Sequence, residues 1–267
     1  MEIALVIIIT CLLCGLLFGI ISTVAGIGGG VMYVPFMSLF LLLPMISAVD
    51  TSSFIILISS AAAFLTYWKD GRTDLKSSVI FGCFSILGSF ICTILFDVIF
   101  TIDSTVLKWI FAVVLLFTSI IMIKKARKSR LAAKNSTEDP VEFSLKNHDY
   151  KAHLKKGIPL FILAGFLAKL IGIGGGVINT PSLNIVLEYP IHNATAISTS
   201  IIFFTAIYNT IVNTITGQID FIIGILIGIG AILGSIVGAK LSNKIPKVVL
   251  QYFVAIVLVI LSIRMFF

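Results

Sequence analysis

Two glycine-rich stretches are the part of this sequence whose residue types and spacing best suit chemistry. The run Gly26-Ile-Gly-Gly-Gly-Val-Met-Tyr-Val-Pro35 recurs further along the chain as Gly172-Ile-Gly-Gly-Gly-Val-Ile-Asn-Thr-Pro181. Such a run breaks a helix, and a helix that starts after it points its positive N-terminal dipole at the glycines, which favours an anion. We therefore predict an anion site at the glycines, with the prolines as helix breakers: Gly28, Gly29, Gly30, Gly174, Gly175, Gly176, Pro35 and Pro181.

Other interpretations of the glycines stay open. They could serve close packing between helices, as small residues do in membranes. A dinucleotide-binding loop is disfavoured, because no strand and helix unit surrounds the motif.

Polar side chains inside apolar segments are candidates for substrate contact, because burying them is costly. Lys169, just before the second motif, would add a cation, unless its ammonium reaches out to the membrane surface. Hydroxyls in both halves and one amide could bind an oxyanion: Thr51, Ser52, Thr199, Ser200 and Asn179. The alternatives are hydrogen bonds to helix carbonyls or between helices.

The elements that position these residues must be transmembrane helices. The 267 residues are 58% hydrophobic and 12% charged, with a mean hydropathy of +1.14, which excludes a soluble globular domain. Seven apolar runs are about long enough to span a bilayer: Ile3–Val24, Ala48–Trp68, Leu75–Phe96, Val106–Ile123, Ala194–Ile215, Phe221–Leu241 and Val248–Phe267. Three shorter runs, Val31–Leu43, Ile158–Ile171 and Val177–Leu187, complete an expected all-α polytopic membrane protein with eight to ten segments.

The positive charge is concentrated in one stretch. Ten of the 19 Lys and Arg residues lie in 124–156, which we interpret as a cytoplasmic linker with little structure of its own rather than as a nucleic-acid site. The chain then divides into a first transmembrane repeat, 1–123, the basic linker, 124–156, and a second repeat, 157–267.

The two repeats are predicted to have opposite topology. Asp74 matches Asp220 at the offset that relates the two glycine motifs, whereas a further two-residue shift aligns Thr51-Ser52 with Thr199-Ser200. Matched loops carry opposite charge bias, as inverted-topology repeats require. With the linker inside, both termini lie outside.

The paired glycine motifs, each followed by a Thr-Ser pair, resemble the sulfite exporter TauE/SafE family, also called the toluene-sulfonate uptake permeases. The resemblance covers the chain except its linker. It implies a permease of the bacterial inner membrane for sulfite, sulfoacetate or a related organosulfur anion. We expect a secondary transporter working by alternating access; a passive anion channel and a non-transporting membrane subunit are the alternatives.

Few residues remain that could bind a coupling ion, a metal or a cofactor. Asp50 is the carboxylate nearest to the motifs, and it could serve a coupling ion, a proton or sodium, or only cap a helix. The histidines, His148, His153 and His192, lie in loops or at an interface, so we predict no metal, no cofactor and no enzyme activity. The bilayer is an expected partner, and a homodimer is compatible with the sequence.

Overall fold

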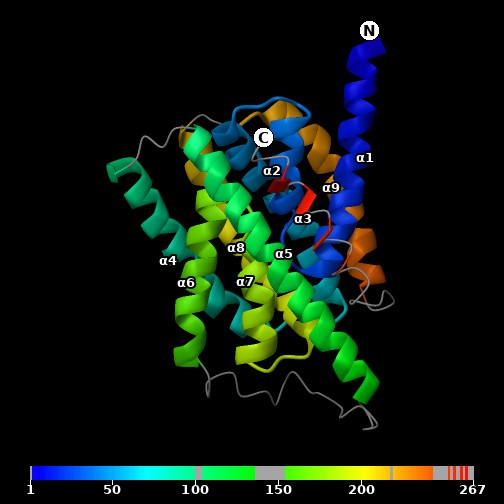
Figure 1. The fold of residues 1–267 in the computed structure, drawn as a ribbon, viewed down its shortest axis with the longest axis vertical. Coiled ribbons are helices and arrows are strands. Elements are labelled where there is room, and N and C mark those ends of the chain that lie inside the picture. Colours follow the sequence, from blue (N-terminus) through cyan, green and yellow to red (C-terminus); the bar gives the residue numbers. More distant parts are fainter. Residues whose placement is uncertain are drawn as a thin grey trace.

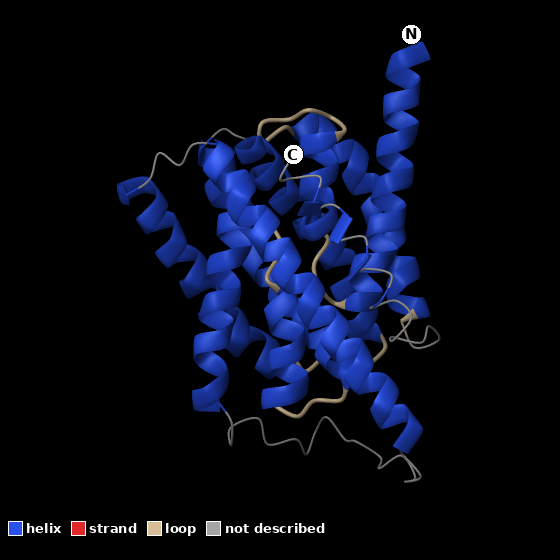
Figure 2. Ribbon diagram, viewed as in Figure 1, coloured by secondary structure: helices blue, strands red, loops and turns tan. Residues whose placement is uncertain are grey.

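The computed structural model describes residues 2–99, 104–135, 154–216 and 219–242, with scattered helical positions between 252 and 263. Within these ranges the regular structure is helical and contains no strand (Figure 2). The elements in chain order are α1 (Glu2–Ala25), α2 (Gly30–Leu39), α3 (Met45–Lys69), α4 (Leu75–Ile99), α5 (Ser104–Asn135), α6 (Leu154–Ile171), α7 (Gly176–Pro181), the π-helical η3 (Ser182–Val186), α8 (Ile191–Thr216) and α9 (Phe221–Leu241).

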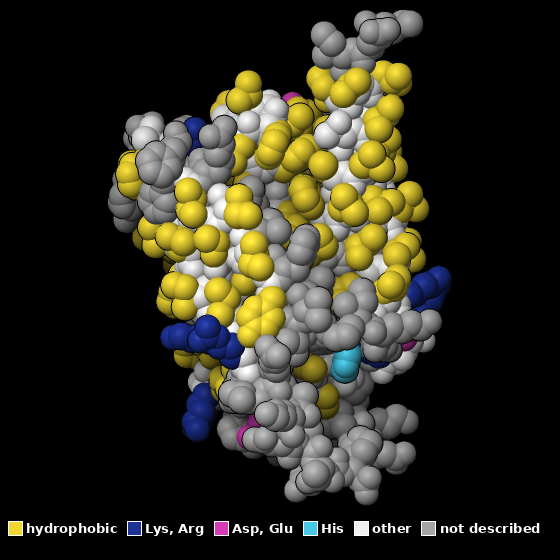
Figure 3. All heavy atoms as spheres, turned by 45° about the vertical axis from the view of Figure 1, so that its right-hand side comes forward, with side chains coloured by type: hydrophobic (Ala, Val, Ile, Leu, Met, Phe, Trp, Pro, Cys, Tyr) yellow, Lys and Arg dark blue, Asp and Glu magenta, His cyan; other side chains and the backbone are white. Residues whose placement is uncertain are grey.

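Membrane-spanning length is reached by five of the described helices: Leu5–Ala25, Met45–Lys69, Leu75–Leu95, Ile191–Ile215 and Phe221–Leu241. Their outer faces carry exposed large hydrophobic side chains such as Val6 and Ile222. Figure 3 shows a broad belt of such side chains on one face of the molecule. The prediction of an all-α polytopic membrane protein is confirmed, while the run Val248–Phe267 lies mostly outside the described residues.

The stretch that was predicted to be a linker with little structure contains helix at both of its ends. Helix α5 continues to Asn135, and α6 begins at Leu154, so both ends of the stretch 124–156 are helical. The residues after Lys124 are mainly Lys, Arg, Ala and Leu, which are strong helix formers and carry α5 onward. Residues 136–153 lie outside the described ranges.

Corresponding helices make corresponding contacts. Helix α1 packs along α9, and α6 packs along α4. Gly19 of α1 lies against the carbonyl oxygen of Ala231, and Gly165 of α6 lies against that of Ser85, so the two contacts are related by the same offset as the glycine motifs. Figure 1 shows α1 descending from the top of the view and α6 rising from the bottom, so these two matched helices run in opposite directions.

The two ends of the molecule differ in charge. We call the end that holds Asn135 and Leu154 the linker end, and the end at which α1 and α5 begin the far end (Figure 1). On the face drawn in Figure 3, most Lys and Arg side chains gather toward the linker end, below the hydrophobic belt. A charged zone beyond an apolar belt is typical of a membrane surface.

Candidate functional site

The two glycine motifs break the helices and then touch each other. Helix α1 ends before Gly26 and α6 ends before Gly172. A Cβ atom built on Gly28 would lie 2.6 Å from the carbonyl oxygen of Ile173, and one built on Gly176 would lie 2.7 Å from that of Gly26. Only glycine allows backbones to approach this closely. We call the contact between residues 26–30 and 172–176 the glycine crossing.

Two serines lock the glycine crossing from opposite halves of the chain. Ser52 Oγ donates to the Gly172 carbonyl oxygen at 2.8 Å, and Ser198 Oγ donates to that of Gly26 at 3.2 Å. The two serines are related by the same offset as the two glycines, so the geometry pairs Ser52 with Ser198. The predicted alignment of Ser52 with Ser200 is therefore wrong, and Ser52 holds the backbone together.

The two breaks share most of their backbone geometry. Gly28 and Gly174 have φ values of 79° and 77°, in the left-handed region. The next pair differs: Gly29 has a φ of −69°, whereas Gly175 has a φ of 74°. The helices that follow also differ, because α2 runs for 10 residues and α7 for 6 before the chain turns π-helical in η3.

The prolines do not make these breaks. Pro35 lies inside α2, which continues to Leu39, so its predicted helix-breaking role is wrong. At Pro181 the α-helical turns end, yet the chain continues as η3, in which Leu187 N donates to Ser182 O at 3.1 Å. The glycines break the helices because their left-handed torsions cannot continue a right-handed helix.

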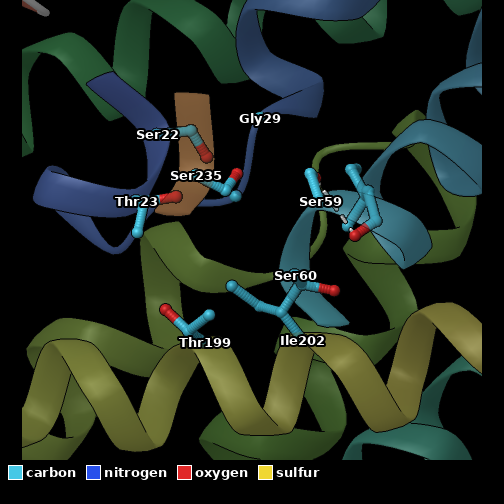
Figure 4. Close-up of a pocket in the computed structure, with 10 residues that line it drawn as sticks. Ser22, Thr23, Gly29, Ser59, Ser60, Thr199, Ile202 and Ser235 are labelled. Atoms are coloured by element: carbon cyan, nitrogen blue, oxygen red, sulfur yellow. Dashed lines mark hydrogen bonds between the residues drawn. The ribbon is translucent and has the colours of Figure 1, made fainter. Parts of the chain in front are cut away.

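A small pocket, with a cavity volume of about 10 Å³, lies beside Gly28 and Gly29. Among the described residues that line it none is charged, and six carry hydroxyl groups: Ser22, Thr23, Ser59, Ser60, Thr199 and Ser235. Figure 4 shows Ser22, Thr23 and Ser235 on one side of this space and Thr199 with Ile202 on the other. We call it the hydroxyl pocket.

A second small pocket, also with a cavity volume of about 10 Å³, lies beside Gly174. We call it the amide pocket, after Asn209, and its lining is Ser53, Ile56, Ala168, Gly174, Thr205, Ala206 and Asn209. The offset that relates the glycine motifs carries all of these except Asn209 onto lining positions of the hydroxyl pocket. The amide pocket has Ala168 and Ala206 at the positions where the hydroxyl pocket has Ser22 and Ser60.

The two pockets lie toward different ends of the molecule. Helix α3 runs toward the linker end and α8 runs away from it (Figure 1). The hydroxyl pocket uses Ser60 of α3 and Thr199 of α8, which both lie nearer the linker end than Ser53 and Asn209 of the amide pocket. Each pocket therefore lies beside its own glycine motif and nearer its own end of the molecule.

The predicted cation lies on the amide-pocket side. The half-buried Lys169 donates from Nζ to Asn213 Oδ1 and interacts electrostatically with Asp50, which is 8% exposed. Its counterpart in the hydroxyl pocket is Thr23. Asp50 lies inside α3 and does not cap it, since the N-cap is Pro44.

The other residues predicted to bind the substrate do not lie together in one site. Thr51 Oγ1 accepts from Asp220 N at 2.9 Å, and Ser200 Oγ donates to Ala196 O at 3.0 Å, so both serve structural contacts. Thr199 lines the hydroxyl pocket. Asn179 is fully buried, and its amide atoms have no hydrogen-bond partner within the described residues.

Gly30 and Gly176 pack within the glycine crossing, which agrees with the packing interpretation for these two. Ser22, Ser59, Ser60 and Ser235 line the pocket although they were not among the residues predicted from the sequence. Serine in apolar helices usually bonds to its own helix, so these residues carry a weak signal. The available signal was that Ser235 belongs to an Ile-Leu-Gly-Ser tetrad repeated in both halves.

Arg72 joins three elements at the linker end. It lies in the loop between α3 and α4, and its guanidinium donates to Ser242 Oγ at 3.0 Å, to His192 O at 3.3 Å and to Ala239 O at 3.4 Å. It also lies 4.6 Å from the ring centroid of Tyr67. Burial lowers the pKa of the Arg72 guanidinium, which nevertheless stays charged at neutral pH. We call this set of contacts the Arg72 latch.

The chain resembles known membrane proteins along most of its length. The family described as sulfite exporter TauE/SafE matches residues 11–265. A protein named as a probable membrane transporter of Methanocaldococcus jannaschii is 29% identical over 198 residues, covering 72% of this chain and 67% of the relative. One of the same description from Bacillus subtilis is 28% identical over 205 residues, covering 72% and 73%. No solved structure matches the chain.

Proposed function

The chain belongs to the sulfite exporter TauE/SafE family and is a membrane transporter, and from this premise we propose that it is a secondary transporter that moves a small organosulfur anion by alternating access. The observation that carries the proposal is the glycine crossing with a pocket on each side. A carrier needs a site that reaches one side of the membrane at a time, and two pockets separated by a closed contact suit that need.

The two halves act as inverted-topology repeats in this proposal. Support comes from Ser52 and Ser198, which make the same bond to opposite motifs, and from the opposite directions of α1 and α6. In such proteins, exchanging the conformations of the two repeats converts one facing state into the other. The differing torsions of Gly29 and Gly175 mark where the two repeats already differ.

The linker end is the cytoplasmic end in this proposal, because Lys and Arg gather there and cytoplasmic loops are rich in these residues. The protein then lies in the inner membrane of a bacterium, with both termini on the outer side. The hydroxyl pocket serves the cytoplasmic side, and the amide pocket with Lys169 serves the outside.

A carrier is favoured over a passive channel by the packing of the glycine crossing. No space for a methyl group remains at Gly28 or Gly176, which supports a carrier whose two halves must move before an anion can pass between the motifs. The description of the family suggests sulfite as the substrate, and sulfonates such as sulfoacetate are included in the proposal as related organosulfur anions.

The test is uptake by the purified protein in proteoliposomes, with sulfite, sulfoacetate, taurine and sulfate offered in turn, with and without a proton or sodium gradient. Saturable uptake of sulfite or a sulfonate is the expected result. Uptake that rises linearly with concentration would indicate a channel, and no uptake of any of these anions would overturn the proposed substrate class.

A further inference from the structure

The hydroxyl pocket contains hydrogen-bond donors that nothing in the described chain uses. Thr23 is 5% exposed and Ser235 is 2% exposed, yet neither side-chain hydroxyl bonds to any other described residue. A buried hydroxyl without a partner costs free energy, so such groups usually meet water or a ligand. Two such hydroxyls face the same cavity, so we expect a bound molecule there that accepts hydrogen bonds from them (Figure 4).

The matching serine in the other half, Ser89, shows that a serine at this position can bond to the backbone of a neighbouring helix. Ser89, the counterpart of Ser235, donates from Oγ to the carbonyl oxygen of Gly165 at 2.8 Å. Gly19, the counterpart of Gly165, lies next to the backbone of Ser235 at the same kind of helix contact. Ser235 nevertheless makes no such bond, and its side chain lines the hydroxyl pocket instead.

The backbone adds donors at the same place. Helix α2 begins at Gly30, and its N-cap, Gly29, provides no side-chain cap. The first N–H groups of a helix have no partner within the helix, and they favour an anion. Gly28 and Gly29 bring this end of α2 to the wall of the hydroxyl pocket.

We infer that the hydroxyl pocket is the site that holds the oxyanion group of the substrate, with Thr23 and Ser235 donating hydrogen bonds to its oxygens beside the first turn of α2. This inference rests on the proposed function and narrows it to a residue-level site. The described lining holds no cation, so neutral hydrogen-bond donors and the N-terminal dipole of α2 stabilise the anionic charge. Lys169 then acts on the other side of the glycine crossing and is not a ligand in this pocket.

The test compares Ser235→Ala with its matched control Ser89→Ala, and adds Thr23→Val, which keeps the shape of the side chain. Binding of sulfite and sulfoacetate to the purified full chain is measured by titration calorimetry, and thermal unfolding is followed in parallel. Ser235→Ala and Thr23→Val should each weaken anion binding by about tenfold or more, as expected for losing a hydrogen bond to a charged group. Neither should lower the Tm, because neither hydroxyl supports the fold.

Ser89→Ala should behave in the opposite way, with a lower Tm and anion binding within about twofold of wild type, because its hydroxyl joins two helices. If wild type binds an anion and Ser235→Ala and Thr23→Val bind it equally well, the pocket assignment is wrong and the proposed function stands. If wild type binds none of the anions offered, both the pocket assignment and the proposed substrate class are wrong.

Discussion

Gly29 and Gly175 occupy the same position in the two glycine motifs, yet Gly29 has a right-handed φ of −69° and Gly175 a left-handed φ of 74°. The neighbouring pair, Gly28 and Gly174, has closely similar φ values of 79° and 77°, so the difference is local. In the proposed transport cycle Gly29 and Gly175 exchange conformations.

A side chain at Gly175 should block this cycle. In Gly175→Ala the left-handed torsion would cost about 1–2 kcal/mol, and the new Cβ would lie 2.8 Å from the Ala164 carbonyl oxygen. Uptake should fall by at least about tenfold, the scale set by that cost, while membrane insertion persists. Proteoliposome uptake normalised to inserted protein measures this, and wild-type uptake would remove Gly175 from the mechanism.

The reciprocal serine bonds should hold the two halves together. Ser52→Ala and Ser198→Ala each leave a buried glycine carbonyl with one donor fewer, at a cost of about 1–3 kcal/mol. Thermal unfolding in detergent should show a lower Tm for each variant. Ser200→Ala is the control, because its hydroxyl bonds only within its own helix, to Ala196 O. A Tm for Ser52→Ala as high as that of Ser200→Ala would contradict the lock.

Lys169 should matter for anion entry from the far end. Lys169→Met removes the cation beside the amide pocket, so KM for uptake should rise, by about tenfold if one charge-assisted contact is lost. The change also leaves Asp50 without its opposite charge. The double variant Asp50→Asn/Lys169→Met separates the two effects. Recovery of a wild-type KM in the double variant would mean that Lys169 only neutralises Asp50.

The Arg72 latch should keep the linker end closed. Arg72→Ala removes the contacts that join the α3–α4 loop to His192, Ala239 and Ser242, so the hydroxyl pocket should open more often toward the linker end. A cysteine placed by Ser60→Cys, after replacement of the native cysteines, reports this through labelling with a membrane-impermeant maleimide in inside-out vesicles. Labelling should accelerate in Arg72→Ala and less so in Arg72→Lys, and unchanged labelling would show that Arg72 does not restrict access.

The sequence predicted the transmembrane helices and the helix ends at the glycine runs, because apolar length and a glycine run are local signals. It failed where the outcome depended on how distant segments meet. One shared site at the glycines seemed sufficient, but Gly28 and Gly176 touch backbones across the crossing and divide that space in two.

Hydroxyl roles were also hidden from the sequence. Ser52 and Ser235 are both serines in apolar helices, yet one bonds to a distant carbonyl and the other faces a pocket. Which carbonyl lies within reach of a serine is set by helix packing, and residue type does not report it. Pro35 was misread for a related reason, since α2 tolerates it once the glycines have already broken the chain.

The most direct test of alternating access is paired labelling of two matched positions, Ser60→Cys in the hydroxyl pocket and Ala206→Cys in the amide pocket. Each is labelled with an impermeant maleimide, Ser60→Cys from the linker side and Ala206→Cys from the opposite side, with and without an anion that shows saturable uptake. Under alternating access the anion should change the two labelling rates in opposite directions, because opening one pocket closes the other. Alternating access would be contradicted if both labelling rates rise together, or if a transported anion changes neither rate.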